Sequence, residues 1–152
     1  KKAVEIMTPV TQIFRYEAKT ILNKEALAKI KEEHYSRIPI YSETRDNIIG
    51  ILYAKELIGY DVSTAKTVEE MCRKNDLTFV EENIKLDVLM NHMIQERVHL
   101  AFVFDQFHSL SGIVSLEDIM EEILTVEIMD ETDTDADLQH NAKNSNTKIF
   151  LT

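Results

Sequence analysis

The feature that most constrains the fold of this chain is an internal repeat. Residues 4–7 (VEIM) match residues 68–71 (VEEM) at an offset of 64. Later matches fall at offsets of 63 and then 62, the last of which relates residues 50–51 to residues 112–113. The offset shrinks by one residue at a time, as deletions in loops would make it. The order of the matched elements therefore predicts two copies of one unit of about 60 residues, each too small to bury a sufficient core alone.

Each half of the chain carries the same order of patterns: strand, helix, strand, strand, helix. An amphipathic helix is expected around Leu27 in the first half and around Leu89 in the second, where apolar residues recur at i, i+3, i+4 and i+7. Short apolar runs between polar turns predict the strands, at residues 13–16, 38–41 and 48–53 in the first half and 77–80, 100–104 and 110–114 in the second. A closing helix is expected to begin near Ala54 and near Ser115.

These patterns predict an α+β fold in which two β-α-β-β-α units pack sheet against sheet. We assign residues 4–62 to the first unit and residues 67–126 to the second. Residues 127–152 are then a C-terminal tail that is first acidic and later polar.

The net charge of −10 comes from one segment. Ten of the 27 Asp and Glu residues lie between Glu117 and Asp137, where there is no Lys or Arg, so 17 acids (27 − 10) face 17 bases in the rest of the chain. Two interpretations stay open: a solvated helix face that runs into a disordered tail, or a charged switch or docking element that senses divalent cations such as Mg²⁺. An acidic chain repels a phosphate backbone, which excludes a general nucleic-acid-binding role.

Composition excludes several other classes of protein. A single cysteine, Cys72, rules out an internal disulfide, and no apolar run approaches the ~20 residues of a membrane span. With three glycines there is no Gly-rich phosphate loop, and the five histidines show no metal-ligand spacing. We therefore expect neither catalysis nor a protein-bound zinc ion.

Several short motifs resemble a known family. Residues 7–9 (MTP), 36–41 (SRIPIY) and 112–119 (GIVSLEDI), in this repeated arrangement, look like a tandem pair of CBS domains, the Bateman module. A second set of runs narrows the resemblance to the CorC/HlyC/CNNM group of magnesium and cobalt efflux, hemolysin-like membrane proteins; these runs are residues 36–41, 46–50, 99–101, 112–123 and 127–131.

The resemblance implies a setting for the chain. In that family the pair lies between a membrane domain and a C-terminal transporter-associated domain, on the cytoplasmic side of the membrane. CBS pairs also associate through their helices, which implies a homodimer. They bind adenine nucleotides, such as ATP or AMP, in the cleft between the two repeats.

Ser115 and Asp118 suit such a ligand physically. A hydroxyl and free N–H groups at the start of a helix can receive a phosphate, and a short carboxylate one turn later can accept both ribose hydroxyls. The same S-x-x-D spacing is also a plain capping box that binds nothing. The resemblance implies further nucleotide-binding residues, so that the full expected set is Thr8, Thr11, Ile13, Tyr35, Ser36, Arg37, Ile38, Pro39, His99, Ser115 and Asp118.

The two halves are unequal at this site. The first half has Tyr53 where the second has Ser115, and Glu56 where the second has Asp118, so we expect one good site and one degraded site. Arg37 is expected to meet the phosphates, although a surface arginine paired with a carboxylate is the alternative. Because the chain is acidic, binding should favour Mg²⁺-bound ATP or a smaller nucleotide such as AMP.

The leading hypothesis is thus a nucleotide-sensing regulatory module of a membrane transporter. One alternative is a structural dimerisation platform without ligand. Another is the regulatory insert of a soluble enzyme.

Overall fold

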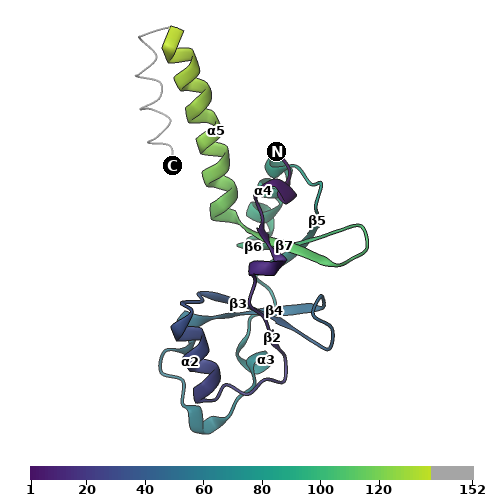
Figure 1. Ribbon diagram of the computed structural model, residues 1–152, viewed down its shortest axis with the longest axis vertical. Coiled ribbons are helices and arrows are strands. Elements are labelled where there is room, and N and C mark those ends of the chain that lie inside the picture. Colours follow the sequence, from purple (N-terminus) through teal and green to yellow (C-terminus); the bar gives the residue numbers. More distant parts are fainter. Residues whose placement is uncertain (138–152) are drawn as a thin grey trace.

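The computed structural model describes residues 1–137 and confirms the α+β class expected from the sequence. It contains two β-sheets, one in each repeat, with helices packed against them. Figure 1 shows the first repeat below and the second repeat above, with the long last helix leaving the body at the top. The predictions for the polar end of the tail lie outside the described residues.

The sheet of the first repeat has the strand order β2-β3-β4, formed by Tyr16–Glu17, Arg37–Tyr41 and Ile48–Tyr53. β2 runs parallel to β3, and β3 runs antiparallel to β4. Helix α2 (Lys24–Glu32) connects β2 to β3 and begins where the side chain of Asn23 accepts the N–H of Ala26 at 2.8 Å. Its apolar stripe buries Ala26 and Ile30 in the core of this repeat.

The second repeat is built in the same way. Its strands are β5 (Leu77–Glu81), β6 (Leu100–Phe104) and β7 (Leu110–Ser115). Helix α4 (Leu86–Glu96) connects β5 to β6, and helix α5 (Leu116–Asp137) follows β7. α5 continues through residue 126, where we placed the end of the second repeat, and carries the acidic segment as one helix.

The opening segment of each repeat packs on the other repeat. Strand β1 (Thr8–Pro9) pairs antiparallel with β7 of the second sheet, and Ala3 of helix α1 (Ala3–Ile6) is buried in the second core. Conversely, Val68 of helix α3 (Val68–Met71) is buried in the first core. This exchange ties the two repeats into one folding unit.

Gly50 and Gly112, which are equivalent in the repeat, lie directly beneath the segments that each repeat packs on the other. A methyl group on Gly112 would collide with the carbonyl oxygen of Thr8, and one on Gly50 would lie 2.7 Å from both the carbonyl oxygen of Arg73 and Sγ of Cys72. Glycine is required at both positions because any side chain would push the exchanged segment away from the sheet.

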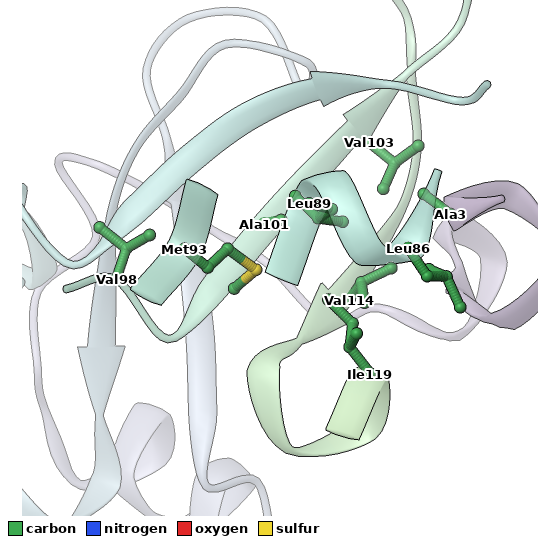
Figure 2. Close-up of a cluster of buried hydrophobic side chains, with 9 residues drawn as sticks. All are labelled: Ala3, Leu86, Leu89, Met93, Val98, Ala101, Val103, Val114 and Ile119. Carbon is green, nitrogen blue, oxygen red and sulfur yellow. The ribbon is translucent and has the colours of Figure 1, made fainter. Parts of the chain in front are cut away.

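Three groups of buried side chains hold the molecule together. Figure 2 shows the core of the second repeat, in which α4 and the start of α5 cover one face of the sheet. Between the two sheets lies a third cluster that draws on both repeats, as sheet-to-sheet packing predicts; it contains Ile48, Ile51, Tyr53, Leu100, Phe102 and Leu110. Its continuous apolar surface makes the two halves interdependent.

Two expected elements differ in the structure. The strand expected at residues 13–16 is reduced to β2, because the chain first turns through a 3₁₀ segment, Val10–Gln12, on its way from the second sheet to the first. The closing helix expected from Ala54 is only a 3₁₀ turn, Ala54–Leu57. Tyr53 offers no side-chain cap there, and Gly59 adopts a φ of 81° soon after.

A third 3₁₀ segment, Val62–Thr64, lies where the first repeat ends. Within residues 1–137, no helix is both long enough and apolar enough to cross a membrane.

Candidate functional site

A cleft of about 280 Å³ lies between the two repeats. Five residues predicted from the sequence line it together: Thr8, Ser36, Arg37, Ser115 and Asp118. Three further lining residues were not predicted, namely Leu100, Ile113 and Glu117. The cleft thus brings together the start of β3 in one repeat and the β7–α5 junction in the other.

The β7–α5 junction is fixed by hydrogen bonds. Ser115 ends β7 with only 7% of its surface exposed, and its hydroxyl oxygen accepts the N–H of Asp118 at 3.1 Å. The N–H of Leu116 donates to the carbonyl oxygen of His99 at 3.0 Å. The capping role of Ser115 is therefore present, and it places the exposed carboxylate of Asp118 at the mouth of the cleft.

Arg37 enters the cleft from the opposite repeat. It begins β3, and its Nη2 atom lies 3.2 Å from Oε2 of Glu117. Both side chains are more than a third exposed, and such exposed ion pairs contribute only about 0–1 kcal/mol. A polyanionic ligand could therefore displace Glu117 from Arg37 at little cost.

Four of the other expected site residues lie away from this cleft. Tyr35 stacks on Phe14 with ring centroids 4.6 Å apart and lines a separate cleft beside α2. Ile38 and Pro39 are buried in β3, because β3 is the central strand of the first sheet. Thr11 is exposed in the 3₁₀ segment.

The last two expected residues are placed differently again. Ile13 is half-buried directly after the 3₁₀ segment. His99 faces Asp76 rather than the cleft: both its backbone N–H, at 3.1 Å, and its ring Nδ1, at 3.0 Å, approach Asp76 Oδ1. The structure therefore does not bring these two residues into the cleft described above.

The equivalent position in the first repeat is filled by the protein's own side chains. The hydroxyl of Tyr53 donates to Asp76, the same carboxylate that holds His99. Glu56 pairs with Arg73 at 2.6 Å, and the Arg73 guanidinium lies 5.4 Å from the centroid of the Tyr53 ring. The residues that match Ser115 and Asp118 in the first repeat are thus held in a bonded network that links the two repeats.

The pKa shifts of Asp76 and Tyr53 agree with this arrangement. Burial opposes ionisation of Asp76, but the hydrogen bonds from Tyr53 and His99 outweigh it, so that the pKa of the Asp76 carboxyl is lowered. Burial, reinforced by the bond to Asp76, raises the pKa of Tyr53. Asp76 is therefore an ionised acceptor and Tyr53 a neutral donor at neutral pH.

No sequence pattern indicated Asp76 or Glu117 as members of these networks. The repeat relates Asp76 to Gln12, which differs in charge and length. Glu117 belongs to a run of acids that favoured a solvated face. Within the described part of the chain, no three His, Cys, Asp or Glu side chains are grouped closely enough to hold a metal ion.

Comparisons with known proteins identify the family. The CBS domain model matches residues 23–63 and 68–125. The magnesium and cobalt efflux protein CorC of Escherichia coli K12 is 34% identical over 134 residues, which is 88% of this chain and 45% of that protein. The chain therefore spans about half the length of this relative.

Solved structures agree with the sequence comparison. The CBS domain of a bacterial CNNM/CorC family Mg²⁺ transporter in complex with ATP is 35% identical, with a TM-score of 0.73 over 82% of this chain and 87% of that one. The same domain with the inhibitor IGN95a is 36% identical, with a TM-score of 0.73 over 81% and 76%. A hemolysin-like CBS protein of Oenococcus oeni PSU is 28% identical, with a TM-score of 0.70 over 80% and 89%. The chain is a tandem pair of CBS domains and belongs to the CNNM/CorC family.

Proposed function

We propose that this chain is the regulatory CBS pair of a CNNM/CorC-like transporter and that it binds an adenine nucleotide in the cleft between its repeats. The observation that carries the proposal is the meeting of Ser115 and Asp118 from one repeat with Ser36 and Arg37 from the other. The ATP complex of a relative at 35% identity supports the choice of ligand.

The chemistry of the cleft suits the two ends of a nucleotide. The exposed carboxylate of Asp118 can accept the two ribose hydroxyls. The hydroxyl of Ser36 and the guanidinium of Arg37 can bind phosphate oxygens, which arginine holds with two parallel hydrogen bonds. The apolar sides of Leu100 and Ile113 complete the lining.

The size of the cleft implies that binding widens it. Its volume of about 280 Å³ lies just below the range of about 300–1,000 Å³ that ligand sites occupy. Separation of the exposed Arg37–Glu117 pair would open it and free the guanidinium for phosphate. We therefore expect nucleotide binding and loss of this ion pair to occur together.

Charge favours a magnesium complex of ATP over the free ligand. The cleft holds one arginine and two carboxylates, Glu117 and Asp118. With Asp118 assigned to the ribose, Glu117 is left beside the phosphates, where it repels a bare polyphosphate. Mg²⁺ prefers phosphate and carboxylate oxygens and would remove this repulsion. AMP, with fewer charges, would depend less on the metal.

The regulatory step would pass through α5 and the exchanged segments. Asp118 and Glu117 lie in the first turn of α5, so a ligand that binds them acts at the base of this helix. We place the module on the cytoplasmic side of the membrane, joined to the membrane domain and the C-terminal transporter-associated domain of the full-length protein. The energy available for regulation is limited to the difference in ligand affinity between the two transporter states.

Isothermal titration calorimetry tests the proposal directly. ATP, ADP and AMP are titrated into the chain, with and without Mg²⁺, beside Asp118→Asn. We expect saturable binding that falls by about tenfold or more in the variant, equivalent to one lost polar contact of about 1.4 kcal/mol. Glu121→Gln, which removes an exposed charge from α5 outside the cleft, is the matched control and should bind like the wild type.

Two results would overturn the assignment. No heat with any of the three nucleotides would favour a dimerisation platform without ligand, in which Ser115 serves only as a helix cap. Equal binding by Asp118→Asn and the wild type would move the site away from this cleft.

A further inference from the structure

A cleft of about 720 Å³, larger than the cleft between the repeats, lies at the outer edge of the second sheet. It is formed by the end of β5 with the turn after it, and by the end of β6 with the β6–β7 turn. None of its lining residues belongs to the cleft proposed for the nucleotide. The proposed nucleotide function therefore leaves this feature unexplained.

Exposed aromatic rings form one part of the cleft. Phe79 is 53% exposed and Phe107 is 77% exposed. Phe79 packs edge-to-face against Phe104, with centroids 5.6 Å apart, so its position is set by the sheet. Phe107 is presented by a turn in which the carboxylate of Asp105 accepts the N–H groups of Phe107 at 2.8 Å and Ser109 at 3.0 Å. Such grouped apolar exposure on a soluble surface marks an interaction site.

Acidic side chains form the other part. Glu81, Glu82 and Asp105 line the cleft, and the described residues that line it include no Lys or Arg. Asp105 is used to hold the turn, which leaves Glu81 and Glu82 to face a ligand. Carboxylates beside exposed aromatic rings select a cation with an apolar stem, which is the chemistry of arginine and lysine side chains.

The strand that carries Phe79 is an edge strand. The order of the second sheet is β1-β7-β6-β5, so one side of β5 has no neighbouring strand among the described residues. Natural edge strands are usually blunted by charge, proline or a bulge. β5 instead places an exposed phenylalanine at its centre, with Glu81 only at its end.

Two clefts flank β5 and share Phe79, Val80, Glu81 and Asn83 in their linings. Phe79 and Glu81 lie on the face of the larger cleft, in register with Phe102 and Phe104. Val80 packs with the core of the repeat. The second cleft, of about 550 Å³, extends from β5 to Val88 of α4, which is 52% exposed. An added strand beside β5 would place its side chains within reach of both clefts.

We propose that the free edge of β5 is a docking site for an extended, basic polypeptide segment of a partner protein, which adds to the second sheet as a further strand. Main-chain hydrogen bonds to β5 supply affinity. Alternate Arg or Lys residues of the segment pair with Glu81 and Glu82 and cover Phe79 and Phe107. The intervening apolar residues lie beside Val88.

A titration followed by nuclear magnetic resonance tests this proposal. The probe is the peptide acetyl-Arg-Val-Arg-Val-Arg-amide, added to the ¹⁵N-labelled chain up to millimolar concentration. We expect saturable amide shifts at residues 77–83 and 104–108, and weaker binding by about tenfold in Phe107→Ser and in Glu81→Lys. Both changes lie at exposed positions, so folding is retained. Ile58→Ser, which alters an exposed apolar residue of the first repeat, is the control.

Four outcomes would overturn the proposal. The first is no shift at any peptide concentration, and the second is an equal response to acetyl-Glu-Val-Glu-Val-Glu-amide. The third is the same saturable shifts with arginine amide alone, which would make the cleft a site for a small cation. The fourth is concentration-dependent broadening of residues 77–81 without peptide, which would make a second copy of the chain the occupant. Because no nucleotide is present, none of these results depends on the proposed function.

Discussion

Arg37 in the first repeat and Glu117 in the second form an ion pair across the cleft that the two repeats share, with Nη2 and Oε2 3.2 Å apart. From the sequence, Arg37 is interpreted either as a phosphate-binding residue or as a surface arginine paired with a carboxylate, and its position fits both interpretations. The arginine lies in the cleft and is also bound to a carboxylate. A phosphate group of the proposed nucleotide would therefore compete with Glu117 for the same guanidinium.

This competition predicts the effect of Glu117→Gln. Loss of the carboxylate frees Arg37 and removes repulsion of the phosphates, so affinity for ATP without Mg²⁺ should rise by about tenfold. The increase in ATP affinity on adding Mg²⁺ should also be smaller in this variant than in the wild type. Calorimetry with and without the metal measures both effects, and Glu121→Gln is the control on the same helix. An unchanged dependence on Mg²⁺ would show that Glu117 does not face the phosphates.

Asp76 predicts how stability depends on pH. Because the folded protein lowers the pKa of this carboxyl, its contribution is complete above the ordinary aspartate pKa of about 3.9 and is lost as the pH falls through the lower folded value. The free energy of unfolding should therefore decrease with acid in this range, and Asp76→Asn should reduce that slope. At neutral pH the variant should be less stable by about 1–3 kcal/mol, since Tyr53 and His99 lose an ionised acceptor.

Urea denaturation over a series of pH values measures this effect. Asp87→Asn alters an exposed carboxylate in the first turn of α4 and should keep the acid slope of the wild type. Parallel acid profiles for the wild type and Asp76→Asn would contradict the assignment of Asp76 as the bonded carboxylate that links the repeats.

The close approach of β1 to Gly112 predicts that no larger residue is tolerated at this position. In Gly112→Ala the new methyl group would collide with the carbonyl oxygen of Thr8 and lie 2.7 Å from Sδ of Met7. Strand β1 would have to move away from β7, at a cost of about 1–3 kcal/mol. The midpoint of urea denaturation should fall accordingly, whereas Ser111→Ala, one residue earlier in β7, should change it little. Equal midpoints for the two variants would show that β1 is not held against Gly112.

The local elements could be predicted closely from the sequence. The strands at residues 48–53 and 100–104 have the expected bounds, because each is a short apolar run between polar turns. The difference between the two closing helices also follows from single residues. Ser115 caps α5 through its hydroxyl, whereas Tyr53 at the matching position cannot, and only a 3₁₀ turn forms there.

The contacts between the repeats could not be predicted in the same way. The repeat pattern shows that residues 4–7 and 68–71 are equivalent, but it does not show that each packs on the opposite core. Asp76 bonds to Tyr53 and His99, which lie 23 residues away on either side, and the repeat pairs it with a residue of different chemistry. Such networks depend on three-dimensional proximity that no local period encodes.

Exposed apolar residues on the helices predict the oligomeric state. Ile94 of α4 is 52% exposed, and Met120 and Met129 of α5 are 42% and 62% exposed. We expect a homodimer that buries this helical surface, and Met120→Asp should weaken it by about tenfold or more, since it places a charge in an apolar contact. Sedimentation velocity over a range of concentrations measures the change.

Salt provides an independent check on the same dimer. α5 carries the acidic residues Glu117, Asp118, Glu121, Glu122 and Glu127, so contact between two copies of this helix brings like charges together. Added salt screens this repulsion, and the dimer should therefore become tighter at higher ionic strength. Phe107→Ser changes an exposed ring in the turn between β6 and β7, outside both helices, and should leave the dimer unaltered. A wild type that stays monomeric at high concentration and high salt would exclude the helical interface.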